Sequence, residues 1–518
     1  MRRAVPWLSL FVLIAPTTAT AQYSSAAPEV SDRTEAANPL EANGFEAFVE
    51  GLLDEWKVPG VAVGAVKDGE VVLLEGYGYR NLEDQEPITP QSILAIGSNS
   101  KSFTVVLMAQ LVDEGRLDWD APVKAYLPDF QLYDDYATEN MRVKDLVTHV
   151  SGLPRHDVLW FGRSLTREEL FQRLRHLEPT TTFRGRWQYQ NLMFMTAGYL
   201  VERIAGRSWD DLVAERIFEP LNMTRSNTSV SKTPMAGDFS YPYQLVDDEL
   251  KRIPFRNIDN VGPAGSINSS VEEMVRYIQM NIDYGLWEGT RILSEGNSKL
   301  MQSPQSVVTG EMPDPELGPS TYGFALRVSS YRGHKWVQHG GGIDGFISAM
   351  AWLPNDNIGV MVLSNMSGGA NPVPGLIVQR VFDDLLELEP IDWNSRTRER
   401  IAEARAEEQA EQTALRENRV AGTSPTLDLE SYIGRYSHPA HGDIEVRVHE
   451  GRLSVTLDQF TFWLTHYHYD VFQIDAQETI VPFEGRAQFR MDKEGQVASL
   501  LLPLEPALPD LVFVRKSN

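Results

Sequence analysis

The sequence contains no cysteine, so disulfide bonds and thiolate chemistry are excluded. Positively charged residues are few: 47 lysines and arginines stand against 72 aspartates and glutamates, which gives a formal net charge of −25. This excess of negative charge argues against nucleic acid and anionic membrane surfaces as partners. After the first residues, no segment is apolar over the roughly 20 residues that a membrane-spanning helix needs. We therefore expect a soluble protein with no membrane span and no nucleic-acid partner.

The N-terminus carries the pattern of a secretory signal peptide. Arg2 and Arg3 precede an apolar run over 4–15, and the small residues 19–21 follow it. That order is typical of a signal peptide, which we place at 1–21. The alternative is a buried N-terminal helix. We favour export, which predicts a periplasmic or secreted protein, and the lack of cysteine excludes a lipoprotein anchor.

A serine and a lysine stand three residues apart at the predicted start of a helix. Ser98 and Lys101 follow an apolar run that ends at Gly97, and an apolar helical pattern continues from Phe103 to Val112. Residues at i and i+3 share a helix face, so the lysine can reach the serine hydroxyl. The helix N-terminus also favours the negative charge that develops on a carbonyl oxygen under attack. This arrangement predicts a nucleophile beside a base.

Two further motifs follow in the chain. The first is Tyr-Gln-Asn at 189–191, and the second is His-Gly-Gly-Gly at 339–342, after a strand-like segment. With the serine–lysine pair they resemble, in order and separation, the S-x-x-K, Y-x-N and K/H-x-G elements of serine β-lactamases and penicillin-binding proteins. The chain resembles the serine hydrolases related to class C β-lactamases, a group that includes esterases, D-aminopeptidases and D-amino acid amidases.

Three other stretches support this resemblance. They are similar to the family's LTHTSGLP turn, its PAGGLxST segment and its paired core strands, and they lie at 146–154, 262–269 and 339–354. The similarity covers roughly residues 41 to 385. It implies an α/β (α+β) domain with an antiparallel sheet flanked by helices, of the β-lactamase/transpeptidase type, which we place at 41–390.

The distribution of apolar residues agrees with that fold. Strand-like segments occur at 61–66 and 71–74 and again between 322 and 363, whereas the region between 117 and 264 is mostly helix and loop. Strands at both ends with helices between them imply one antiparallel sheet assembled from the two ends of the domain. The nucleophile helix then lies between that sheet and a helical subdomain.

The flanking segments differ in character from this domain. A polar leader occupies 22–40, and 391–424 is rich in Arg, Glu and Ala, which predicts a solvated helical linker. Short strand patterns separated by turn residues fill 425–518 and predict a small barrel or sandwich. This part is similar to the lipocalin-like C-terminal barrel of some of these hydrolases, with Tyr432–Tyr436 as the usual opening.

The resemblance gives the first motif residues their roles. Ser98 attacks a carbonyl and carries the acyl group, and either Lys101 or Tyr189 accepts its proton, a choice that the sequence leaves open. Lysine can act as a base only where burial or neighbouring positive charge lowers its pKa. Asn191 is expected to hydrogen-bond Lys101 or the substrate amide.

The third motif supplies backbone rather than side chains. Gly340, Gly341 and Gly342 let a strand approach the substrate closely. One N–H there, which we assign to Gly342, joins the N–H of Ser98 in an oxyanion hole.

Position 339 departs from the β-lactamases and transpeptidases, which usually carry lysine there as a fixed cation for a substrate carboxylate. We count His339 among the catalytic residues, and since it is mostly neutral near pH 7 it is better suited to hydrogen bonding than to anchoring a carboxylate. As substrates, β-lactams and peptides with D-Ala-D-Ala termini are therefore less favoured, and other amides or esters are more favoured. An arginine elsewhere in the chain could still supply the charge.

We therefore predict an exported serine hydrolase, without cofactor or metal, that cleaves a small peptide or other amide through an acyl-enzyme. An esterase or a weak β-lactamase on the same machinery is the nearest alternative. A non-catalytic protein that binds peptidoglycan or a protein partner is the alternative from another class. The joint presence of Ser98, Lys101, Tyr189 and His339 argues against it. Substrate stereochemistry, endo- or exo-cleavage and oligomeric state are left open.

Overall fold

The computed structural model of the protein describes residue 40 and residues 43–517, apart from 247, 310–313, 369, 418 and 476–484. All of these belong to one compact unit, Pro39–Asn518. The signal peptide predicted at 1–21 and nearly all of the leader predicted at 22–40 lie outside the described residues. In the described part of the chain, no helix is both long and apolar enough to cross a membrane.

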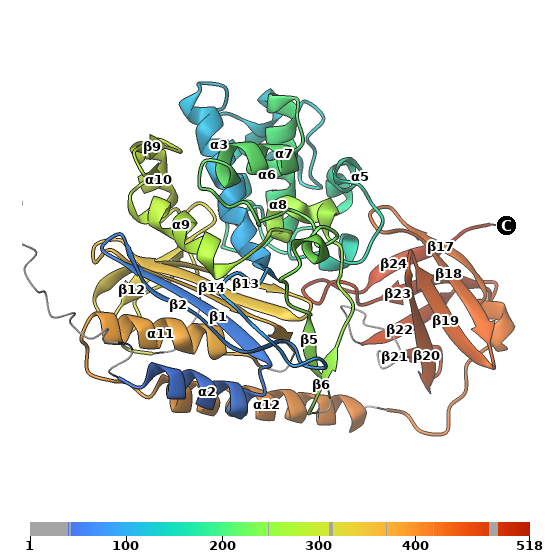
Figure 1. The fold of residues 1–518 in the computed structure, drawn as a ribbon. Coiled ribbons are helices and arrows are strands. Elements are labelled where there is room, and N and C mark those ends of the chain that lie inside the picture. Colours follow the sequence, from blue (N-terminus) through green and yellow to red (C-terminus); the bar gives the residue numbers. More distant parts are fainter. Residues whose placement is uncertain are drawn as a thin grey trace, which may run out of the picture. The chain divides into compact units, whose positions relative to one another are not determined.

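An antiparallel sheet forms the centre of the main domain (Figure 1). In spatial order its strands are β10 (Ser306–Val307), β11 (Thr321–Tyr322), β12 (Arg327–Tyr331), β13 (His334–Ile343), β14 (Phe346–Leu353), β15 (Ile358–Ser364), β1 (Gly60–Lys67), β2 (Glu70–Asn81) and β3 (Glu86–Pro87). β1, from the beginning of the domain, pairs with β15, from its end. This confirms the predicted sheet built from both ends of the sequence.

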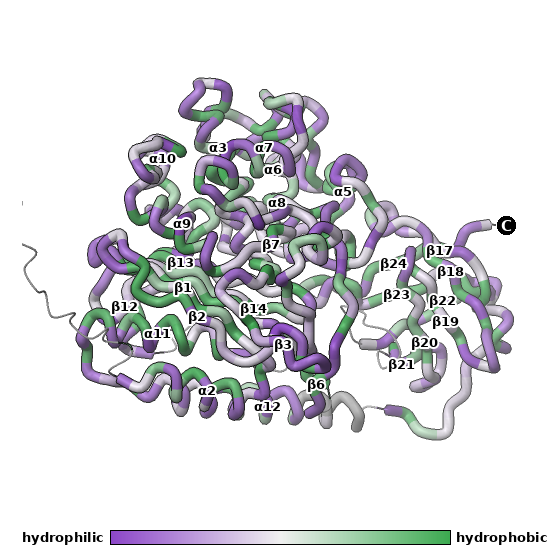
Figure 2. Tube along the Cα trace, viewed as in Figure 1, coloured by the Kyte–Doolittle hydropathy of each residue, from purple (hydrophilic) through white to green (hydrophobic). Residues whose placement is uncertain are grey.

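Helices cover both faces of the sheet. Alternate side chains of β1 point to opposite faces: Val61 and Val63 pack with α2 and α11, whereas Ala62 and Val66 belong to the core that includes α3 and α9. Figure 2 shows the apolar character of these central strands. The helices are α2 (Phe45–Trp56), α11 (Val373–Leu385), α3 (Ser100–Asp113) and α9 (Val271–Ile282).

Helix α3, which follows Ser98, runs through the interior of the main domain. Every residue from Ser100 to Ala109 is buried, which is typical of a core helix. Helices α6 (Asn191–Ala205) and α8 (Gly262–Gly265) pack against it. Other helices of this subdomain are α4 (Asp135–Asn140), α5 (Arg167–Arg173), α7 (Trp209–Val213) and α10 (Glu295–Met301).

Short strand pairs hold the connecting segments. β4 (Leu94–Ala95) pairs with β7 (Asn268–Ser269), and this pairing anchors the segment that leads into Ser98. The other short pairs involve β5 (Tyr243–Val246), β6 (Glu249–Arg252), β16 (Met366–Ser367), β8 (Leu286–Trp287) and β9 (Thr290–Arg291).

Helix α12 (Trp393–Glu417) lies within the predicted linker. Its first residue packs in the core beneath the sheet, because Trp393 is buried and its indole N–H donates to Asp383 at 3.0 Å. Arg400 pairs with the buried carboxylate of Asp314 at 2.6 Å. The first turns of this helix are therefore part of the main domain, and its middle is exposed to solvent.

The C-terminal part is a closed barrel, which confirms the predicted all-β fold (Figure 1). Its first strand, β17, closes the barrel by pairing with its last, β24. The interior is filled by inward-facing apolar residues such as Ile444 and Val446. The strands are β17 (Gly434–His438), β18 (Gly442–His449), β19 (Arg452–Leu457), β20 (Phe460–His468), β21 (Val471–Asp475), β22 (Arg486–Met491), β23 (Val497–Leu502) and β24 (Leu511–Arg515).

One loop of the main domain packs against the barrel. Val158 belongs to the barrel's own apolar core. Phe161 stacks on Phe460 with ring centres 6.3 Å apart, and Arg163 pairs with Asp458 at 3.2 Å. Apolar, stacking and ionic contacts together make this an interface rather than a loose tether.

Candidate active site

Ser98 lies in a turn between β4 and α3, within the short helix Gly97–Asn99. Gly97 has a positive φ of 53°, and a Cβ at this position would lie 2.7 Å from the backbone nitrogen of Gly342. Glycine adopts this conformation at no steric cost, and it leaves room for the neighbouring strand. The turn therefore brings Ser98 beside β13.

Lys101 is fully buried one helical turn after Ser98. Its Nζ is 3.0 Å from Ser98 Oγ and 2.7 Å from the carbonyl oxygen of Ala264. Burial lowers the pKa of Lys101 well below its ordinary value of 10.5, and the Arg155 guanidinium lowers it further, while Asp157 acts in the opposite direction. The structure thus gives this lysine both the contact and the lowered pKa that a base requires.

Tyr189 contacts the same serine hydroxyl. Its phenol interacts with the Ser98 side chain, and its ring centre lies 4.9 Å from Lys101 Nζ. Burial raises the pKa of Tyr189 to about 12, although the interaction with Ser98 and the charge of Arg155 oppose this rise. A phenol with that pKa keeps its proton at neutral pH.

Asn191 is the first residue of α6 and is largely buried. Its Nδ2 donates to Asp157 Oδ1 at 3.0 Å. The sequence interpretation gave this amide to Lys101 or the substrate, but the hydrogen bonds of Lys101 go to Ser98 and Ala264. A bond to a substrate N–H would use the Oδ1 of Asn191, which the contact with Asp157 does not involve, so the predicted bond to the substrate amide stays a prediction.

His339, on β13, is 5% exposed, and both of its ring nitrogens contact protein groups. Nε2 lies 3.1 Å from the hydroxyl of Tyr322, and Nδ1 lies 2.6 Å from the carbonyl oxygen of Gly340. Burial, and then the charge of Lys101, lowers the pKa of His339 to about 3. The ring is therefore neutral near pH 7 and supplies no fixed cation.

The glycines of the third motif differ in how much space a side chain would have at each position. A Cβ on Gly341 would clash with the carbonyl oxygen of Ile96 and the hydroxyl of Ser348. A Cβ on Gly340 would have its nearest neighbour 3.7 Å away, which is an ordinary contact. We expected the glycines to open the strand towards the substrate. At Gly341 the close neighbour is instead the turn that carries Ser98.

Gly341→Ala should lower kcat/KM by about 100-fold. The added methyl pushes β13 away from the nucleophile turn and displaces the Gly342 N–H, which is the proposed oxyanion donor. Loss of one oxyanion donor costs about 3 kcal/mol. Gly340→Ala is the matched control, since the same methyl fits there without a clash. Steady-state kinetics with a small chromogenic substrate measures both. Equal losses in the two variants would contradict this assignment.

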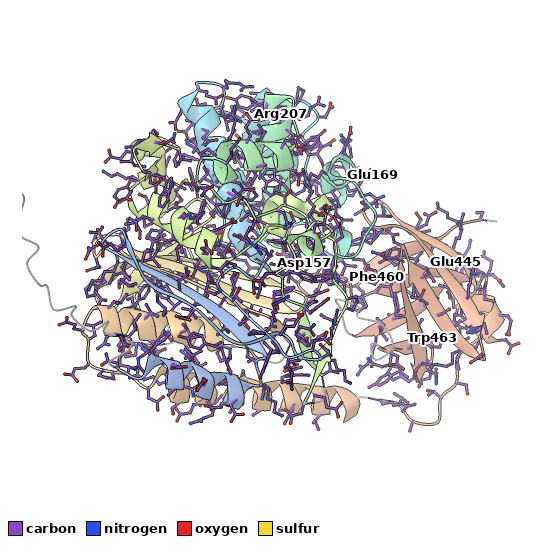
Figure 3. The ribbon with its side chains drawn as sticks, in the orientation of Figure 1. Asp157, Glu169, Arg207, Glu445, Phe460 and Trp463 are labelled. Carbon is purple, nitrogen blue, oxygen red and sulfur yellow. The ribbon has the colours of Figure 1, made fainter. Side chains whose placement is uncertain are left out.

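Asp157 is a residue of the site that the sequence did not reveal. Its carboxylate accepts hydrogen bonds from Asn191, from Trp160 Nε1 at 2.9 Å and from Arg155 Nε at 2.5 Å. Figure 3 labels it together with Phe460 of the barrel, whose partner Phe161 lies four residues further along the same loop. No motif marks this aspartate. Its position shortly after the family-like turn is the one signal in the sequence that points to it.

Two arginines lie near the site, and neither was singled out from the sequence. The Arg155 guanidinium is 5.2 Å from the ring centre of Tyr189. Arg327, on β12, lies 5.0 Å from the ring centre of Trp187, and after burial and Lys101 its charge contributes to the lowered pKa of His339. Arg327 therefore places positive charge near the neutral His339, and Arg155 places positive charge near Tyr189.

The motifs and the fold agree with the family comparisons. The family model described as Beta-lactamase matches residues 45–380, and a model described as a domain of unknown function (DUF3471) matches residues 418–515. The chain therefore belongs to the β-lactamase family. It is a serine hydrolase of the type formed by the β-lactamases and penicillin-binding proteins.

Two relatives with assigned activities are hydrolases. The unguisins hydrolase ungD' of Aspergillus campestris is 27% identical and aligns over 93% of this chain and 92% of its own length. The D-aminopeptidase of Brucella ovis is 29% identical over 63% of this chain and 60% of its own length. The first match extends over both domains, and the second has about the extent of the main domain.

Solved structures show the same fold. The octameric penicillin-binding protein homologue from Pyrococcus abyssi has a TM-score of 0.60 and 25% identity, over 89% of this chain and 98% of that chain. The class C β-lactamase from Rhodobacter sphaeroides has a TM-score of 0.53 and 22% identity, over 66% of this chain and 99% of that chain. The likeness to the second protein concerns the fold alone.

Proposed function

We propose that this protein cleaves an amide bond of a small peptide through an acyl-enzyme on Ser98. The observation that carries this proposal is the fully buried Lys101, whose Nζ lies 3.0 Å from Ser98 Oγ. A serine hydroxyl is a weak nucleophile until a neighbouring base accepts its proton. Lys101 is placed to supply that base.

In this proposal Lys101, rather than Tyr189, is the general base. Burial lowers the pKa of the lysine and raises that of the tyrosine, so the neutral amine and the neutral phenol are both favoured. A neutral amine that donates one N–H to the Ala264 carbonyl can turn its lone pair towards the Ser98 hydroxyl. Tyr189 then acts as the proton donor.

The reaction has two halves. Ser98 Oγ attacks the carbonyl carbon as its proton passes to Lys101, and the N–H groups of Ser98 and Gly342 hold the oxyanion. The C–N bond then breaks, and the leaving amine takes a proton from Tyr189, which regains one from Lys101. In the second half, water gives a proton to Lys101 and attacks the acyl carbon. Ser98 Oγ then leaves and takes that proton from Lys101, which releases the acid product and restores the neutral amine.

The pH dependence of kcat/KM should identify the base. Lys101 must be neutral to act, so activity should be lost as pH falls through its pKa, and this rising limb should lie well below 10.5. Tyr189 should contribute no falling limb below about pH 12. Tyr189→Phe should therefore keep the rising limb at reduced activity. Loss of that limb in the tyrosine variant would assign the base to Tyr189 instead.

The neutral His339 bears on the substrate class. Position 339 itself provides no cation for the carboxylate of a β-lactam, so that charge would have to come from Arg155 or Arg327, and we propose that other amides are favoured. The relative named D-aminopeptidase supports a peptide or amino acid amide. We therefore propose peptides and amino acid amides as the substrate class.

A substrate panel tests this proposal. The panel contains L- and D-peptides, amino acid amides, p-nitrophenyl esters and nitrocefin, and a fluorophosphonate probe reports whether Ser98 reacts at all. We expect probe labelling and faster turnover of a peptide or amide than of nitrocefin. Hydrolysis of esters alone would establish the esterase alternative. A folded protein that the probe does not label would support a non-catalytic binding role.

We also propose that the protein is exported to the periplasm or the medium. The charged, apolar and small-residue order at 1–21 supports this. N-terminal sequencing of the protein from its own cells should give Gln22 as the first residue. A chain that keeps Arg2 and Arg3 would contradict export through a cleaved signal peptide.

A further inference from the structure

Three buried side chains form a hydrogen-bonded row behind Tyr189. His149, Tyr322 and His339 come from separate segments of the chain, and each is at most 5% exposed. His149 Nε2 lies 3.2 Å from Tyr322 Oη, which lies 3.1 Å from His339 Nε2. The ring centre of His149 is 4.3 Å from that of Tyr189, so the row packs directly against the proposed proton donor.

The two ends of the row determine the direction of every hydrogen bond in it. The backbone N–H of Gln190 donates to His149 Nδ1 at 3.0 Å, so the proton of a neutral His149 is on Nε2. At the other end, His339 Nδ1 is 2.6 Å from the Gly340 carbonyl oxygen, which can only accept. Nδ1 of His339 therefore carries the proton. The Tyr322 hydroxyl accepts from the first histidine and donates to the second.

No other protonation state of His339 satisfies all of these hydrogen bonds. A proton on Nε2 would point two N–H groups at the Tyr322 oxygen and leave the hydroxyl proton without an acceptor. If Nδ1 carried no proton, its lone pair would also face the lone pairs of the Gly340 carbonyl oxygen, 2.6 Å away. A doubly protonated ring has the same conflict at Nε2. Buried polar groups left in such conflicts are costly, so the row favours one tautomer of His339 strongly.

The backbone of His149 shows that its ring is held in place. Its φ is 58°, in the left-handed region that residues other than glycine seldom adopt. Such conformations persist where the surroundings hold them. The carbonyl oxygen of His149 accepts from the N–H of Gln188 at 2.8 Å, and its ring packs against Trp187 and Phe194.

We propose that Tyr322 and His149 are positioning residues that hold His339 as the neutral Nδ1–H tautomer. In that state the Nδ1–H of His339 donates to the Gly340 carbonyl oxygen. This hydrogen bond aligns the segment of β13 that carries Gly342, whose backbone nitrogen lies beside the nucleophile turn. Its ring presents neither a charge nor a free nitrogen to the substrate. The alignment concerns the oxyanion donor, so its kinetic consequence rests on the proposed function.

NMR of the full-length protein labelled with ¹⁵N-histidine tests the tautomers without reference to activity. The chain has 10 histidines, and the signals of interest are assigned by their loss in His149→Asn and His339→Asn. We expect His149 as Nε2–H and His339 as Nδ1–H, both neutral between pH 5 and 8. Detection of His339 as the Nε2–H tautomer, or as a cation in that range, would overturn the proposal even if Ser98 proves to be the nucleophile.

Tyr322→Phe tests the kinetic consequence. It removes one hydroxyl from the row, and we expect kcat to fall about tenfold with KM little changed, together with mixed tautomers of His339. Tyr331→Phe is the matched control, because it removes another buried hydroxyl, bonded to Asp383 at 2.7 Å, outside the row. It should lower stability but leave kcat and the tautomers unchanged. Wild-type kcat and an unchanged His339 tautomer in Tyr322→Phe would contradict the proposal.

Discussion

Ser98→Ala should lower kcat by about 1,000-fold or more. The hydroxyl is the proposed nucleophile, and Lys101 and Tyr189 both contact it. Its removal takes away the covalent step but no apolar packing, so the thermal unfolding midpoint should change little. Steady-state kinetics on the best substrate of the panel, together with thermal unfolding, measures both effects.

Ser102→Ala is the matched control in the same helix. Its hydroxyl is buried, donates to the Asn99 carbonyl at 2.8 Å and contacts the Tyr277 hydroxyl at 2.9 Å, so its loss should lower stability. Most of the activity should remain. If Ser98→Ala kept wild-type kcat while Ser102→Ala lost it, the nucleophile would have been assigned to the wrong serine.

Lys101→Met and Tyr189→Phe should each lower kcat by about 1,000-fold, and the double variant should be little worse than either single variant. Both residues relay one proton from Ser98 to the leaving amine, and groups that act as a unit show strongly non-additive effects. Methionine keeps the length of the buried lysine chain while it removes the base. A double-mutant cycle on kcat measures the coupling.

Additive effects in that cycle would mean that the two groups act in separate steps. Trp187→Phe is a useful control, because the Trp187 ring centre lies 6.1 Å from that of Tyr189 and the substitution keeps an aromatic ring there. It should lower activity only modestly. A loss in the control as large as in Tyr189→Phe would show that packing, rather than proton transfer, accounts for the tyrosine effect.

The main features of the fold could be predicted from the sequence, because they depend on local pattern. The apolar segments at 61–66 and 358–363 indicated strands, and their positions at opposite ends of the domain required a sheet assembled from both. The spacing of Ser98 and Lys101 placed them on one helix face, and their 3.0 Å contact follows from that spacing.

The partners of the site residues could not be predicted, because they depend on side chains that only the tertiary fold brings together. Asn191 bonds to Asp157, which carries no motif of its own. His339 is held through Tyr322 by His149, which precedes it by 190 positions. Hydrophobic period and motif spacing carry no information on such pairings.

Helix α12 shows a different limit of prediction from the sequence. Its charged composition predicted a solvated linker, and composition alone described its exposed middle correctly. The packing of Trp393 beneath the sheet depends on one aromatic residue whose partner, Asp383, lies on α11. A single apolar residue in a charged segment is too weak a signal to indicate burial.

Mass spectrometry of the quenched reaction tests the central claim most directly. The protein is mixed with a slow amide substrate, quenched in acid within the first turnover, and digested. The account predicts one adduct with the mass of the acyl group, on the peptide that contains Ser98, and its absence in Ser98→Ala. An acyl adduct on a peptide without Ser98, or turnover with no adduct at any time, would contradict the account.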